Sequence, residues 1–154
     1  MQINVREDDL SGAAIRELLT THLDHAAAQA PPESTHALDL DSLRETGVTF
    51  WTAWHGGDLL GCGALKELDA SHGEIKSMHT AEAFRGRGIA ARMVEHLLGV
   101  ARERGYRRLS LETGSMEGYR AARELYARFG FVECPPFADY RPDPNSVFMT
   151  LELT

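Results

Sequence analysis

The glycine-rich stretch Arg85-Gly86-Arg87-Gly88 constrains the fold most, because it joins a strand pattern to a strongly amphipathic helix. The helix pattern runs to about Arg104, and its apolar face is formed by Ile89, Met93, Val94, Leu97, Leu98 and Ala101. Three segments typical of strands come before the glycines, separated by turn residues, at Thr49–Trp54, Leu59–Glu67 and Glu74–Thr80. The middle of the chain is therefore predicted to be an antiparallel meander that leads into a helix.

The flanking segments complete a mixed α/β pattern. Two further helices are predicted at Leu10–Ala30 and Glu117–Phe129, and Ser34 or Thr35 is expected to cap a short helix through Leu43. Short strands are predicted at Gln2–Arg6, Arg108–Glu112, Phe131–Cys134 and Val147–Leu153. The 154 residues show no internal repeat and suffice for one hydrophobic core. We therefore expect a single domain over residues 1–154, with one sheet and helices packed on it.

Charge and cysteine content limit the function classes. The formal net charge is −7, which argues against the broad positive field that nucleic-acid binding needs. A local basic cluster around Arg85 and Arg87 suits a small polyanion better than a duplex. Two separated cysteines, Cys62 and Cys134, are typical of reduced thiols in a cytoplasmic protein. Because the sequence shows neither a signal peptide nor a membrane-spanning run, we expect a cytoplasmic protein without nucleic-acid or membrane partners.

The glycine-rich stretch has the chemistry of a phosphate site. Its glycines let the backbone approach a ligand closely, and the first turn of the following helix leaves N–H donors unpaired. A pyrophosphate fits there, and two arginines add charge-assisted donors. A solvated loop is the ordinary alternative. The stretch also matches G-x-G-x-x-A, but that dinucleotide fingerprint belongs to a βαβ unit with parallel strands, whereas antiparallel strands are predicted here.

Two motifs in register resemble one family. The run from Met78 to Ala90 resembles motif A of the GNAT N-acetyltransferases, an R/Q-x-x-G-x-G/A loop shortly after a strand. The run from Ala122 to Phe131 resembles motif B, whose core is A-x-x-L-Y-x-x-x-G-F. The resemblance covers the whole chain in element order and residues 74–134 in detail. It implies the acyl-CoA N-acyltransferase fold, with one central, mostly antiparallel sheet and helices on both of its faces.

The resemblance also implies acetyl-CoA as co-substrate, and no metal. The strands Glu74–Thr80 and Arg108–Glu112 are expected to splay apart and admit the pantetheine arm, which would pair with the backbone of Met78, His79 and Thr80. The N–H groups of the glycine loop would hold the pyrophosphate; they belong to Arg85, Gly86, Arg87, Gly88, Ile89 and Ala90. Tyr126 matches the family tyrosine that protonates the departing thiolate. Without the family motif, Tyr126 would be interpreted as a core residue, because an aromatic on the buried face of a helix is usually part of the core.

Some features of the resemblance are less complete. Many members have asparagine where this chain has Tyr119, so we assign Tyr119 to the cofactor arm only by its position. A homodimer is an expectation from the family. The closing segment from Cys134 to Met149 resembles a small bacterial subgroup, members of which are sometimes labelled indole-acetate or generic N-acetyltransferases. The acceptor is expected to be a small molecule, either an amine or an amino-acid-like compound. A basic peptide, which the acidic net charge would suit, is the alternative acceptor.

Charged residues on two neighbouring strands are candidates for the acceptor site. Lys66 and Glu67 precede a turn and Glu74 and Lys76 follow it, so that Glu67 is expected opposite or diagonal to Glu74 and Lys66 near Lys76. A carboxylate such as Glu74 would take the amine proton, and a lysine would hold an anionic part of the substrate. Glu112 is a second candidate base. The alternative is a solvated sheet face with surface ion pairs.

The remaining candidates come from loops. Tyr140, Ser146 and the segment Pro31–His36 are expected to line an acceptor pocket or simply to pack. The seven histidines show no metal-ligand spacing, and the sequence has no G-x-S-x-G elbow. Direct attack by the acceptor amine in a ternary complex is therefore predicted. The alternative function is a non-catalytic acyl-CoA sensor of the same fold.

Overall fold

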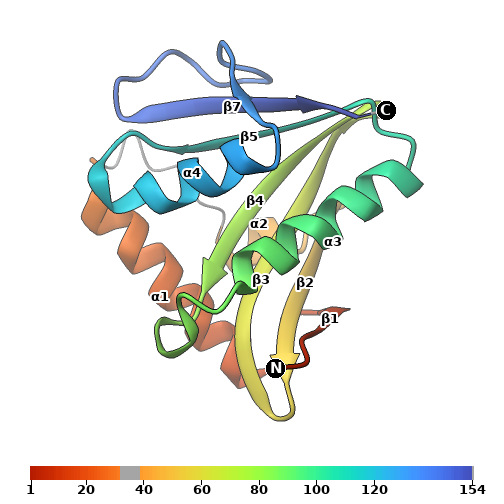
Figure 1. Cartoon of the computed structure of the whole chain (residues 1–154), viewed down its shortest axis with the longest axis vertical. Coiled ribbons are helices and arrows are strands. Elements are labelled where there is room, and N and C mark those ends of the chain that lie inside the picture. The colour runs from red at the N-terminus through yellow and green to blue at the C-terminus, as the bar shows by residue number, and fades with distance from the viewer. Residues whose placement is uncertain (32–38, 154) are drawn as a thin grey trace.

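A computed structural model describes residues 1–31 and 39–153 of the chain. In these residues seven strands form one sheet in the order β1-β2-β3-β4-β5-β7-β6, and β4 and β5 are its parallel pair (Figure 1). The strands are β1 Asn4–Glu7, β2 Val48–His55, β3 Asp58–Asp69, β4 His72–Thr80, β5 Arg108–Gly114, β6 Val132–Glu133 and β7 Ser146–Glu152. The predicted meander is confirmed, since β2, β3 and β4 pair antiparallel with one another.

The sheet opens at the end of β4 that precedes the glycine loop. β4 pairs with β5 only from His72 to Ile75, although β4 continues to Thr80 and β5 to Gly114. A bulge in β4 lies just beyond the last pair, where Ser77 has a φ of 55°. Bulges bend a strand and redirect its backbone groups. The two strands therefore diverge, as Figure 1 shows and as the family resemblance implies.

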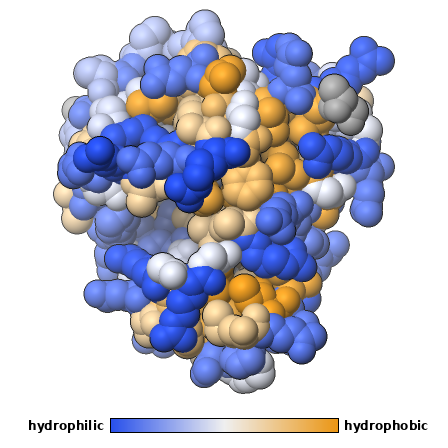
Figure 2. Space-filling view, viewed as in Figure 1, coloured by the Kyte–Doolittle hydropathy of each residue, from blue (hydrophilic) through white to orange (hydrophobic). Residues whose placement is uncertain are grey.

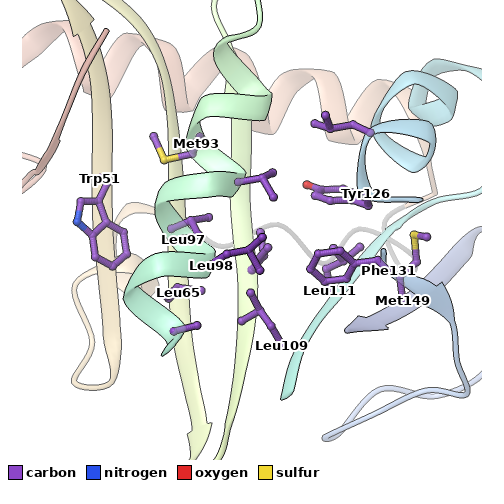
Figure 3. Packing of buried hydrophobic residues seen from close by; sticks show 14 of the residues in the cluster. Trp51, Leu65, Met93, Leu97, Leu98, Leu109, Leu111, Tyr126, Phe131 and Met149 are labelled. Carbon is purple, nitrogen blue, oxygen red and sulfur yellow. The ribbon is translucent and has the colours of Figure 1, made fainter. Parts of the chain in front are cut away.

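Helices α3 (Ile89–Glu103) and α4 (Arg120–Arg128) cover one face of the sheet. The apolar face of α3 is buried in the same hydrophobic cluster as residues of β3, β4 and β5, as its sequence pattern predicts. Figure 3 shows Leu97 and Leu98 of α3 among the buried side chains of this cluster, together with Leu109 of β5. The helix predicted from Glu117 begins as a short 3₁₀ turn, η3 (Glu117–Tyr119), before α4. This face is the larger apolar core of the chain.

Helices α1 (Ala13–Gln29) and α2 (Leu40–Leu43) lie on the opposite face. Ile15, Leu18 and Leu19 of α1 pack on Phe50 and Ala64. The prediction that α1 begins at Leu10 is wrong, because Leu10 has a φ of 67° and the helix starts at Ala13. The expected caps of α2, Ser34 and Thr35, lie outside the described residues. Asp39 caps α2 and accepts a hydrogen bond from the Ser42 N–H at 2.8 Å.

Candidate active site

A cavity of about 550 Å³ enters the molecule where β4 and β5 separate. One end is lined by the glycine loop and the start of α3, and the other by Lys76, Glu112 and Asn145. Side chains of α1 and α4 form its two sides. The space-filling view shows the surface hollowed between α4 and the glycine loop (Figure 2). The cavity thus joins the predicted cofactor motif to the predicted acceptor residues.

The glycine loop has the backbone geometry of an anion site. Gly86 and Gly88 have φ angles of 78° and 80°, a region that residues with a Cβ seldom adopt. Gly88 is the N-cap of α3, and no described side chain caps this helix end. The N–H groups of the first turn are therefore available to a phosphate. Arg85 lines the cavity, whereas the Arg87 guanidinium lies 5.7 Å from the centre of the Phe84 ring.

The residues predicted to pair with a pantetheine arm lie along the cavity. Met78, His79 and Thr80 of β4 line the cavity together with Ile89 and Ala90 of α3. Opposite Met78, a Cβ added to Gly63 would lie 2.8 Å from the sulfur of Met78 and 2.8 Å from Cγ of Met93, so a side chain there would require these methionines to shift.

Histidines from α1 reach this wall. The Nδ1 atoms of His22 and His79 are 3.1 Å apart, and the rings of His25 and His79 pack edge to face. Burial lowers the pKa of both His22 and His79 to about 4, so both rings are neutral at neutral pH. Across residues 1–31 and 39–153, no group of three or more His, Cys, Asp and Glu side chains is arranged to hold a metal ion.

Tyr126 of α4 lies at the boundary between the core and the cavity. Its side chain is buried, its ring packs edge to face on Phe131 at 5.8 Å, and it is one of the cavity-lining residues (Figure 3). Burial raises the pKa of Tyr126 above its ordinary value, which keeps the phenol protonated. Tyr126 therefore packs in the core, and its position at the cavity is also compatible with the acid role that the family motif implies.

Glu112 of β5 lines the cavity and has the most unusual carboxyl group of the site. Burial raises its pKa to about 7, while a hydrogen bond from the Ser146 Oγ, 2.8 Å from Oε2, and the charge of Lys76 act in the opposite direction. A carboxylate with this pKa accepts a proton efficiently at neutral pH. Ser146, predicted to line the pocket, instead acts behind it by holding Glu112.

Glu74 is the other predicted base, and its surroundings are different. The Tyr140 hydroxyl donates to Oε2 of Glu74 at 2.5 Å, and Lys76 Nζ is 3.3 Å from the same oxygen. The side chains of Lys76 and Glu74 are only 9% and 3% exposed. Lys76 reaches the cavity, whereas Glu74 and Tyr140 are not among its lining residues. The structure thus brings Glu74, Lys76 and Tyr140 together as one buried group beside Glu112.

The predicted register around Glu67 is wrong. Lys66 lies opposite Glu74, and Glu67 lies opposite Gly73, so that Glu67 and Glu74 point to different faces of the sheet. The Glu67 carboxylate accepts a hydrogen bond from the Tyr106 hydroxyl at 2.7 Å, and neither Lys66 nor Glu67 lines the cavity. The anticipated stacking of like charges is therefore avoided by placing the two carboxylates on different faces.

The sequence anticipated Tyr119 at the cavity, but not His22, His25, Met116 or Asn145. Tyr119 was assigned to the cofactor arm, and it lines the cavity with its ring so close over Gly114 that no side chain fits there. His25 packs on Tyr119 at 5.6 Å, and Met116 and Asn145 complete this end. His22 and His25 lie three residues apart in the pattern of α1, which was the available signal. Asn145 depends on how a long loop closes.

Comparison with known proteins identifies the family. The model of the "Acetyltransferase (GNAT) family" matches residues 13–131. The chain belongs to the GNAT acetyltransferase family. It is 52% identical to the uncharacterized N-acetyltransferase YsnE of Bacillus subtilis, over 98% of this chain and all of the relative. It is 37% identical to an IAA acetyltransferase of Azospirillum brasilense, over 96% of this chain and 95% of that protein.

Solved structures of GNAT and related proteins share the fold. A Klebsiella pneumoniae protein assigned as an acyl-CoA N-acyltransferase superposes with a TM-score of 0.80 at 27% identity, covering 99% of both chains. A GNAT acetyltransferase from Elizabethkingia anophelis with acetyl-CoA bound gives 0.73 at 20% identity, covering 98% of both chains. The expected fold, one mostly antiparallel sheet with splayed β4 and β5 and helices on both faces, is confirmed, and the parallel pairing of β4 with β5 is a finding of the structure. The chain is an acyltransferase of this family.

Proposed function

We propose that this GNAT enzyme transfers the acetyl group of acetyl-CoA to a small amine or amino-acid-like acceptor by direct attack in a ternary complex. The observation that carries the proposal is the single cavity that runs from the glycine loop to Glu112. The loop offers backbone donors to a pyrophosphate, and the diverging strands offer a channel to a pantetheine arm. Both reactants would then be held beside one base and one acid.

Acetyl-CoA supplies a thioester, whose C–S bond breaks as the new C–N bond forms. Glu112 takes a proton from the acceptor nitrogen, which becomes more acidic as it bonds to carbon. A backbone N–H near Met78, where β4 lines the cavity, would polarise the thioester carbonyl as an oxyanion hole does. The acceptor enters as an ammonium and first loses one proton to solvent, which frees the nitrogen lone pair for attack. The proton that Glu112 takes as the C–N bond forms is the second, and protonation of the departing sulfur gives the free thiol beside the amide.

Tyr126 is proposed to assist the departing sulfur. Because burial raises its pKa, complete transfer of the phenol proton to a thiolate is uphill. A hydrogen bond from the phenol nevertheless stabilises the negative charge as it develops, and the proton follows as the thiol forms. Replacing Tyr126 with Phe is expected to lower kcat by about 10²-fold and to leave the binding of acetyl-CoA unchanged.

The relatives support the enzyme over a binding-only module. YsnE and the IAA acetyltransferase bear acetyltransferase names, and the Elizabethkingia protein of the same fold was solved with acetyl-CoA. An acyl-CoA sensor would need the glycine loop but neither Glu112 nor Tyr126 at the far end of the cavity. We also propose a cytoplasmic location, which the free thiols of Cys62 and Cys134 favour.

A thermal-shift titration with acetyl-CoA tests the cofactor site. A ligand at 100 times its Kd stabilises the native state by about 2.7 kcal/mol, which raises the melting temperature measurably. Arg85→Ala is expected to weaken this shift, because Arg85 lines the cavity. Arg87→Ala is the matched control, because Arg87 lies over Phe84, and it should retain most of the shift. No shift at millimolar acetyl-CoA would refute the proposed function.

A further inference from the structure

The bulge of β4 is an unfavourable local structure beside the cavity. Two residues of β4, Ser77 and Met78, lie opposite the single residue Gly63 of β3, and both of them line the cavity. Ser77 has a φ of 55°, which residues with a Cβ seldom adopt. Within the part of the chain that the structure describes, its buried hydroxyl has no hydrogen-bond partner. Such a conformation persists only where the surrounding structure imposes it.

Cys62 of β3 holds the bulge from the neighbouring strand. Its thiol is only 2% exposed and donates a hydrogen bond to the carbonyl oxygen of Ser77, 3.2 Å from Sγ. Burial raises the pKa of this thiol to about 12, and a hydrogen bond from the backbone N–H of His79 acts in the opposite direction. The sulfur therefore keeps its hydrogen at neutral pH. One side chain thus contacts the backbone on both sides of Met78.

The contact with Cys62 also sets the direction of one backbone donor. The Ser77 carbonyl and the Met78 N–H belong to the same planar peptide unit, in which the two groups point in opposite directions. Because the carbonyl is directed toward Cys62 on β3, the Met78 N–H is directed away from β3. On that side β5 no longer pairs with β4 beyond Ile75, and Met78 lines the cavity that opens there.

We propose that Cys62 is a positioning residue for acetyl transfer, whose thiol holds the Ser77 carbonyl so that the Met78 N–H points at the thioester carbonyl. This inference rests on the proposed function and adds a residue that acts through the backbone, since Cys62 is not among the described residues that line the cavity. A backbone donor stabilises developing charge best when it is already aimed at it. A thiol suits this position because it packs with the apolar Phe50 and Ala64 and still carries a donor.

The carbonyl stretch of bound acetyl-CoA tests the proposal without an acceptor. Infrared difference spectroscopy of acetyl-CoA, isotopically labelled at the thioester carbonyl carbon, isolates this band, and a stronger hydrogen bond to the carbonyl lowers its frequency. Cys62→Val replaces the thiol by an apolar side chain without a donor, so the bound band should move to a higher frequency than in the parent. The Kd of acetyl-CoA should change by less than about threefold, because the glycine loop is unaltered.

Three further variants separate the hydrogen bond from packing. Cys62→Ser keeps a donor, and its band should lie closer to that of the parent than the band of Cys62→Val does. Cys62→Ala lacks the donor and adds no bulk, so it should give the upward shift even if Cys62→Val fails to fold. Cys134→Val is the matched control, because it removes the other free thiol, which is not among the described lining residues, and it should leave the band in place.

The outcomes separate the two proposals. The same band position in the parent, Cys62→Val and Cys62→Ala overturns the positioning role and leaves the binding of acetyl-CoA in place. So does a band that follows the melting temperatures of the variants and not the presence of a donor at this position. If acetyl-CoA does not raise the melting temperature of the parent, the proposed function itself is overturned, and the positioning role with it.

Discussion

The two faces of strand β5 perform different tasks with alternate residues. Leu109 and Leu111 point to the face covered by α3 and α4 and are completely buried in the apolar core. Ser110 and Glu112 point to the other face, where Ser110 bonds to Thr150 at 2.9 Å and Glu112 to Ser146. Apolar burial on one face fixes the register, because a shift by one residue would exchange the faces. Because apolar burial fixes the register, the other face can hold buried polar and charged groups whose burial lowers the stability of the fold.

The same division continues across β4. Ile75 joins the apolar core, while its neighbours Glu74 and Lys76 form the buried pair on the polar face. A buried pair of charges gains little over an apolar replacement, but breaking it by removing one partner is costly. The comparison therefore predicts which substitutions damage stability and which damage catalysis.

The largest expected effect is that of Lys76→Met on stability. It leaves the Glu74 carboxylate buried without its cation, which should cost about 3–5 kcal/mol of unfolding free energy. Urea denaturation followed by far-UV circular dichroism measures the change. The double variant Lys76→Met with Glu74→Gln should recover most of the loss, because no buried charge remains. A double variant as unstable as the single one would show that packing, and not the unpaired carboxylate, is responsible.

Leu109→Ala tests the apolar face. Leu109 is fully buried and does not line the cavity, so the substitution should cost about 2–5 kcal/mol and lower the melting temperature by roughly 5–15 °C. Well below the transition, the kcat of the folded variant should equal that of the parent. Ser110→Ala is the matched control, because Ser110 is the next residue of β5 but lies on the polar face of the sheet. A large drop in kcat for Leu109→Ala would mean that the two faces are not independent.

Glu112→Gln tests the polar face. It should lower kcat by about 10²-fold, since amine attack would lose its base, and the acid limb of the pH–rate profile near pH 7 should disappear. Acetyl-CoA should still raise the melting temperature. If the acid limb of the pH–rate profile remained in Glu112→Gln, a group other than Glu112 would be responsible for it.

The stability of Glu112→Gln should change with pH in a defined direction. The folded-state pKa of Glu112, about 7, lies above its unfolded value of 4.5, so the folded chain holds an extra proton between these values. The stability that this group contributes is complete below pH 4.5 and falls as pH rises toward 7. The variant should therefore gain on the order of 3 kcal/mol relative to the parent between pH 4 and pH 8. If the difference in unfolding free energy between the variant and the parent did not change with pH, the Glu112 carboxyl group would be exposed to solvent.

The sequence predicted the parts of this site that depend on local pattern. The glycine loop, the apolar face of α3 and the meander follow from spacing alone, and the family motifs implied the separation of β4 and β5. The relation of Glu67 to Glu74 was wrong because the local register between β3 and β4, which assigns each residue to a face, cannot be read from composition. Tyr140 and Asn145 reach the site through a long loop whose closure depends on tertiary contacts. The predicted position of Glu112 at the end of β5 was enough to suggest it as a base. Its burial could not be predicted from that position.

The smallest expected effect is that of Ser146→Ala, which tests whether the hydrogen bond from Ser146 sets the pKa of Glu112. The Ser146 hydroxyl donates to Glu112 Oε2 and so favours the ionised carboxylate. Without this donor the pKa of Glu112 should rise further, and the acid limb of the pH–rate profile should move upward by about one pH unit. The rate on the plateau above the limb should stay the same, because the base itself remains. Thr150→Ala removes a hydroxyl from the same strand and face that bonds to Ser110, and it should leave the limb in place. If both variants shift the profile equally, the polar face titrates as one network and Glu112 is not tuned by its own hydrogen bond.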